Sequence, residues 1–94
     1  MSKTIELKEI TINEKDSKYA ELIKIALNNP PEGGLDISEM RKRLRVMDAL
    51  DAAVDNKMEL EDEDVKTLKQ CVTAVRWASV DKSIIDFADY ISAL

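Results

Sequence analysis

Apolar residues between Leu35 and Val54 recur at the spacing of an α-helix. Six of them lie three or four positions apart: Ile37, Met40, Leu44, Met47, Leu50 and Val54. Residues at this spacing share one helix face, so the pattern predicts a single apolar stripe. Asp36 stands directly before the stripe as an N-cap, and Glu39 completes a capping-box pattern. We expect this helix to form the core of the protein.

Three further segments have helical spacing of apolar residues. They span about residues 18–28, 61–78 and 81–93. Asp16 or Ser17 is placed to cap the first, and Ser79 or Asp81 to cap the last. Short turns between such helices favour antiparallel packing around one shared core.

The N-terminal segment from Thr4 to Ile12 alternates apolar and polar residues, which is typical of a strand. Its apolar positions change parity across Lys8 and Glu9, so the two halves are expected to face different surfaces. The strand can pair with residues 57–60 or with another subunit, and an extended arm lying on the helices is the alternative.

Both prolines and both glycines of the chain fall between positions 30 and 34, where they break any helix. We therefore predict an extended arm or short strand over residues 1–15 and a single helical domain over residues 16–94, with the breaker inside it. The expected fold class is all-α or α-dominated, a small bundle of three to four helices.

The amino-acid composition limits which catalytic groups and metal ligands the chain can supply. The chain has no histidine, which removes the commonest general base and zinc ligand, and its one cysteine, Cys71, lies within a predicted helix. The acidic stretch from Asp55 to Asp64 places Lys57 and Leu60 where a calcium-binding loop needs an oxygen ligand and a glycine. We predict a protein that is not an enzyme, with no catalytic residue, cofactor or metal site. The single cysteine and the lack of a long apolar run indicate the cytoplasm and no membrane contact.

Two charged patches and one aromatic residue are the candidate contact residues. The basic patch lies on the central predicted helix and the acidic patch starts the next helix, so their opposite charges can meet within the chain or across an interface. Trp is enriched at interfaces as well as in cores. The candidates are Arg41, Arg43, Arg45, Glu61, Asp62, Glu63, Asp64 and Trp77.

The region from Gly34 to Ile91 resembles small proteins encoded by tailed bacteriophages and prophages. The helical pattern and two runs carry the resemblance, MRKRLR at positions 40–45 and LEDED at positions 60–64. The resemblance implies a phage-related accessory role in the host cell and brings no catalytic residues with it.

Together these features predict a non-enzymatic, self-associating interaction module that serves virion assembly or packaging by binding a larger phage or host protein. One alternative is an acidic inhibitor that occupies the nucleic-acid site of a host protein by mimicking phosphate charge. The other is a small DNA-binding regulator that uses the basic helix at residues 41–45. Nucleic acid is the less favoured partner, because the net charge is −5.

Overall fold

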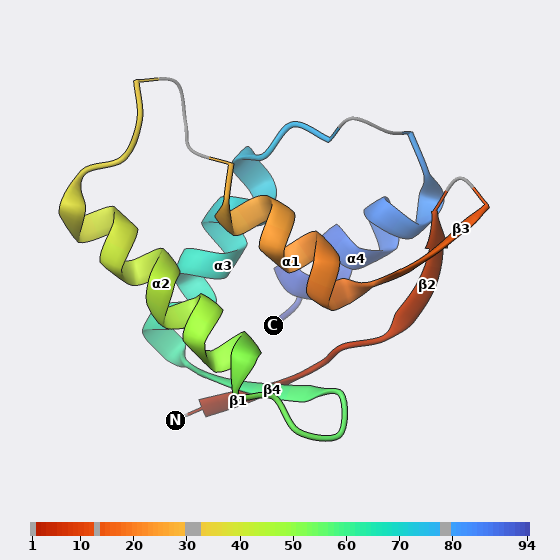
Figure 1. The fold of residues 1–94 in the computed structure, drawn as a ribbon, viewed down its shortest axis with the longest axis horizontal. Coiled ribbons are helices and arrows are strands. Elements are labelled where there is room, and N and C mark those ends of the chain that lie inside the picture. The colour runs from red at the N-terminus through yellow and green to blue at the C-terminus, as the bar shows by residue number, and fades with distance from the viewer. Residues whose placement is uncertain (1, 13, 30–32, 78–79) are drawn as a thin grey trace.

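The computed structural model in Figure 1 describes residues 2–12, 14–29, 33–77 and 80–94. Within these ranges the chain forms four helices and two antiparallel two-stranded sheets. The helices are α1 (Tyr19–Leu27), α2 (Ile37–Asp51), α3 (Asp62–Ala74) and α4 (Lys82–Ser92). The strands are β1 (Ser2–Glu6), β2 (Glu9–Ile12), β3 (Lys15–Lys18) and β4 (Lys57–Glu61). The fold is therefore mixed α/β, and the expectation of an all-α helical bundle is wrong.

The first sheet joins the N-terminus to the middle of the chain. β1 pairs with β4, with Ile5 opposite Met58 and Lys3 opposite Leu60. Ile5, Met58 and Leu60 are buried and the residues between them are exposed, as the two-residue period of a strand requires. The predicted pairing of the N-terminal segment with residues 57–60 is confirmed, and it occurs within one chain.

The second sheet is the hairpin of β2 and β3. The predicted change of parity is confirmed, because β1 and β2 belong to different sheets. β3 has the sequence KDSK, without a single apolar residue, so it carries no periodic signal and its conformation depends on pairing with β2. Glu14, in the connection between the two strands, has a φ of 66°, a conformation that permits a tight turn.

Two of the described helices begin at a side-chain cap that the sequence predicts. The predicted cap of the first helix by Asp16 or Ser17 is wrong, because both residues lie in β3 and α1 begins after Lys18 without a side-chain cap. The Asp36 side chain accepts a hydrogen bond from the Glu39 backbone N–H at 2.8 Å, which confirms the predicted N-cap of α2. Asp81 caps α4 through the Ser83 N–H at 2.8 Å. Ser79, the other candidate for that cap, lies outside the described residues.

Tight turns and the glycine pair connect these elements. Asp55 and Asn56 have φ angles of 54° and 60°, which gives the sharp turn into β4. Positions 30–32 of the predicted breaker lie outside the described residues. Gly33 and Gly34 follow them with φ angles of 90° and 87°, a conformation that favours glycine.

Aromatic side chains of α1 and α4 meet in the core. The Tyr19 and Phe87 ring centroids are 5.0 Å apart in an edge-to-face arrangement, and Tyr90 lies 5.7 Å from Tyr19. The Tyr90 hydroxyl also accepts the backbone N–H of Glu6 at 2.9 Å, so α4 is tied to β1. Figure 1 shows α2 on the outer side of the molecule, away from the hairpin, where it packs against α3, β4 and α1.

Candidate functional site

Helix α2 has two apolar faces. The inner face carries Val46 and Leu50, which are 0% and 6% exposed. The outer face carries Ile37, Met40 and Leu44, which are 63%, 43% and 50% exposed. Because successive residues turn by about 100° around a helix, the mean directions of these two groups lie roughly 130° apart.

The expectation that the stripe of α2 forms the core is therefore wrong. Of the six stripe residues, only Leu50 is buried, and Val54 is among the exposed large apolar residues. Helical spacing gives the same signal for a face covered by neighbouring elements and for an uncovered one. Here α1, α3 and β4 pack against α2, and the inner face is the one that is buried, whereas Ile37, Met40 and Leu44 remain exposed.

An apolar groove of about 460 Å³ runs beside this outer face. It lies between α2, the end of α1 and the segment that precedes α2, and its lining residues are Leu27, Asn28, Gly34, Leu35, Met40, Arg43, Leu44 and Met47. We name the exposed residues Ile37, Met40 and Leu44 with the half-buried Met47 the α2 stripe. The α2 stripe and the groove form one apolar surface, which is the candidate docking site.

Sequence reasoning missed the wall of this groove that lies outside α2. Leu35 directly precedes the Asp36 N-cap, and Met40 is the fourth residue of the helix. Apolar residues at these two positions form a hydrophobic staple, which fixes the angle at which the chain enters a helix. The sequence pattern of Leu35 and Met40 could therefore have predicted one wall of the groove. No local sequence pattern could have predicted that Leu27, from α1, lines it as well.

Arg43 joins α2 to α1. Its Nη1 donates to the backbone carbonyls of Leu27 at 3.2 Å and Asn29 at 3.1 Å, at the end of α1. A guanidinium at this place satisfies carbonyls that the helix leaves open and opposes the negative end of its dipole. The Nε of Arg43 is buried and has no hydrogen-bond partner in the described part of the chain. The structure thus places this candidate contact residue in the wall of the groove.

The other basic residues of α2, the candidates Arg41 and Arg45 and the neighbouring Lys42, differ in their surroundings. Lys42 forms an ion pair with Glu39 and Arg45 forms one with Asp64, each at 3.2 Å. Arg41 is exposed, with no hydrogen bond or ion pair to any residue in the ranges that the structure describes. Within the described residues, three of the four cations of this cluster are thus engaged by their own chain, and DNA binding through this helix stays a prediction.

The acidic candidates lie at the junction of β4 and α3. Glu61 ends β4, and Asp62, Glu63 and Asp64 form the first turn of α3, where carboxylates oppose the positive end of the helix dipole. The side chain of Asp64 is 15% exposed and pairs with Arg45. One contact between the two predicted patches therefore exists inside the chain, and it joins α2 to α3.

Trp77 lies beyond the end of α3, apart from the other candidates. Its half-buried ring meets Phe87 edge to face, with the centroids 6.1 Å apart. It also lines a separate surface pocket of about 560 Å³ together with Ile12, Ile25 and Ile84. The structure does not bring Trp77 together with the α2 stripe.

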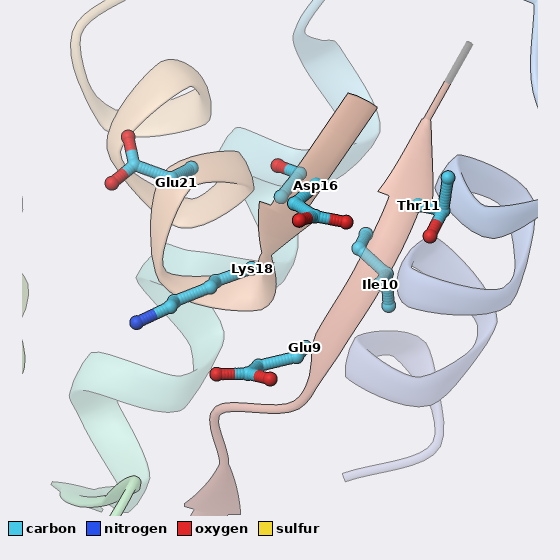
Figure 2. A pocket seen from close by; sticks show the side chains of 7 residues that line it. Glu9, Ile10, Thr11, Asp16, Lys18 and Glu21 are labelled. Atoms are coloured by element: carbon cyan, nitrogen blue, oxygen red, sulfur yellow. The ribbon is translucent and has the colours of Figure 1, made fainter. Parts of the chain in front are cut away.

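A larger depression, about 780 Å³, lies on the hairpin of β2 and β3. Figure 2 shows Glu9 and Lys18 projecting from the same side of the hairpin, with Asp16 and Glu21 nearby. The described residues contain no group of three or more acidic, cysteine or histidine side chains that could hold a metal ion. The depression offers carboxylates, hydroxyls and the amine of Lys18, without the histidine that is the commonest general base.

Two buried ionisable side chains belong to the core. Burial raises the pKa of the Tyr19 hydroxyl, with a further contribution from Asp86. Burial also raises the pKa of the Cys71 thiol, although the positive charge of Arg43 acts in the opposite direction. A thiol with a raised pKa stays protonated at neutral pH, and the thiolate is the nucleophilic form.

Comparison with known proteins gives no match: no family model, no curated protein and no solved structure is similar to this chain. The resemblance to phage-encoded proteins therefore stays a prediction. Across the described ranges, none of the helices combines the length and the apolar character needed to cross a membrane.

Proposed function

We propose that this chain is a non-enzymatic protein-interaction module that binds its partner through the α2 stripe and the adjoining groove. The observation that carries the proposal is the exposure of Ile37, Met40 and Leu44 on one side of a helix, next to an apolar groove. Single exposed apolar residues are common on protein surfaces, whereas a continuous apolar patch marks a site of interaction.

The chemistry of the surface favours a protein as the partner. Met40 and Met47 have flexible, polarizable side chains, which adapt to the shape of an apolar partner surface. A helix with anchors at positions i, i+3, i+7 and i+10 is also the kind of surface that other helices and grooves recognise. The free thiol of Cys71 fits a reducing compartment, so we propose the cytoplasm as its location.

The acidic-inhibitor alternative has less support. It requires the carboxylates to form one continuous strip, yet Asp64 is paired with Arg45, and Glu9, Asp16 and Glu21 lie around the depression on the hairpin. An inhibitor that mimics phosphate charge would bind through carboxylates rather than through the apolar α2 stripe. It stays a prediction.

Site-specific photo-crosslinking tests the proposed docking face. A photoreactive phenylalanine analogue replaces Leu44 and, in a control chain, Ile85, which is 59% exposed on α4. On irradiation in the native cell, we expect position 44 to give one discrete protein adduct, identified by mass spectrometry, and position 85 to give none. The adduct must disappear when Met40→Glu is added to the chain.

Either of two results would contradict the proposal. One is the absence of an adduct at position 44. The other is an adduct that survives Met40→Glu, because a charge in the middle of the stripe removes the apolar contact that docking requires.

A further inference from the structure

The partner follows from the charges beside the α2 stripe, and this inference rests on the proposed function. We propose that the α2 stripe binds the α2 stripe of a second copy of this chain, with the two helices antiparallel. The apolar part of the argument is the spacing of Ile37, Met40, Leu44 and Met47, which lie three, four and three residues apart. This is the alternating spacing of the a and d positions in a helix pair that packs along a seam.

Charged residues flank the seam in a self-complementary order. In the numbering that makes Ile37 and Leu44 a positions, Arg41 and Asp48 are both e positions, on the same side of the seam. Both are exposed, and neither side chain has a hydrogen bond or ion pair with any residue that the structure describes. One flank of α2 therefore carries a free positive charge near its start and a free negative charge two turns later.

An antiparallel pair brings these charges together. In such a pair, the e flank of one helix lies against the e flank of the other. If Leu44 of each copy packs on Met47 of the other, Arg41 of each copy faces Asp48 of the other. Because a two-fold interface repeats every contact, this ion pair forms twice. Antiparallel packing also places opposite ends of the two helix dipoles side by side.

In a parallel pair of α2 helices, the charged side chains on one of the two facing flanks are already engaged within their own chain. It would match the e flank of one helix with the g flank of the other, where Asp36 and Arg43 lie. Asp36 is occupied as the N-cap, accepting the Glu39 N–H. Arg43 is occupied at the end of α1, where it donates to the carbonyls of Leu27 and Asn29. The antiparallel arrangement uses the only flank whose two charges are free among the described residues.

Sedimentation equilibrium of the purified chain over a range of concentrations tests the proposal. We expect a reversible dimer, whose dissociation constant rises on the order of a hundredfold in Leu44→Glu, because two buried leucines are lost at once. Arg41→Asp and Asp48→Arg should each raise it about tenfold, since each creates two like-charge contacts. The double variant Arg41→Asp with Asp48→Arg should return to within about threefold of the wild-type value, because it restores both ion pairs with their signs exchanged.

A control variant separates this effect from a change in net charge. Lys15→Asp makes the same change as Arg41→Asp in charge sign, but on β3, where Lys15 is exposed. It should leave the dissociation constant unchanged. Circular dichroism should show the same helix content in all variants.

Three outcomes would overturn the inference: a chain that stays monomeric at millimolar concentration, a dimer insensitive to Leu44→Glu, or a double variant as weak as the single ones. The crosslinking experiment distinguishes these from failure of the proposed function. A monomeric chain that still gives a discrete adduct with another protein at position 44 loses the self-association and keeps the docking face. A monomeric chain without any such adduct loses both.

Discussion

Helices α2 and α3 have similarly spaced apolar residues, which are buried in α3 and exposed in α2. The α3 residues Val65, Leu68 and Val72 repeat at intervals of three and four, and all three are buried. The α2 residues Ile37, Met40 and Leu44 repeat at the same intervals, and all three are exposed. A stripe in the sequence therefore identifies a helix and the direction of its apolar face without saying what covers that face.

The difference comes from the neighbours of each helix. α3 lies in the middle of the fold, where it contacts α1, α2, α4, β1 and β4. α2 lies at the outer side and contacts α1, α3 and β4 through the face of Val46 and Leu50 (Figure 1). In α2 the exposed residues available to a partner are thus distinct from the buried ones that hold the fold together, and the half-buried Met47 lies between them, packed partly against the core. In α3 the apolar stripe serves the fold alone.

The largest expected difference between α2 and α3 is in how much a leucine-to-alanine change lowers the free energy of unfolding. Leu68→Ala in α3 removes a side chain that is 0% exposed, so the free energy of unfolding should fall by about 2–5 kcal/mol. Leu44→Ala in α2 removes a half-exposed side chain and should change it by less than about 0.5 kcal/mol. Urea denaturation at a concentration where the chain is monomeric measures both. Equal losses would show that the α2 stripe belongs to the core.

Two arginines within α2 give a second, smaller contrast. Arg43→Met keeps the apolar stem but leaves the carbonyls of Leu27 and Asn29 without their donor, so the free energy of unfolding should fall by about 1–3 kcal/mol. Arg41→Met, on the exposed flank, is the matched control and should change it by less than about 0.5 kcal/mol. The same urea titration measures both. A loss in Arg41→Met as large as in Arg43→Met would contradict the division of α2 into an inner and an outer side.

Several local signals were readable from the sequence. The caps at Asp36 and Asp81 and the change of parity between β1 and β2 all depend on contacts a few residues apart, although the predicted cap of α1 at Asp16 or Ser17 does not form. The sequence predicted that the basic and acidic patches can pair, without naming the partners. The structure shows an ion pair between Arg45 and Asp64.

Features that depend on distant contacts were not readable. β3 has no apolar residue and becomes a strand through its partner, and the Tyr90 hydroxyl meets Glu6 from the other end of the chain. The covering of α2 is of the same kind, since its neighbours come from three other elements. The proposed docking face was not predicted for this reason: its residues were predicted correctly as a helix stripe, and wrongly as core.

The smallest expected effect is the pH dependence of the free energy of unfolding. It involves titrating groups on α1 and α3 and none in the α2 stripe. Cys71 is buried on α3, and burial raises its pKa above the ordinary value of 9.0. Tyr19 is buried on α1, where burial raises its pKa above 10.0. The folded state therefore holds these protons more tightly than the unfolded state. As pH rises above about 8, the unfolded chain loses them first, so the free energy of unfolding must fall.

Urea denaturation between pH 7 and pH 11 measures this loss. Below about pH 8 both groups are almost fully protonated in both states, so they contribute almost no slope. Above it, the stability of wild type should decline more steeply than that of Cys71→Ala or Tyr19→Phe, each of which removes one titrating group. Leu44→Ala, in the exposed α2 stripe, should follow the wild-type slope. If Cys71→Ala and Tyr19→Phe also declined as steeply as wild type, the alkaline loss would come from groups outside the core that α1 and α3 share.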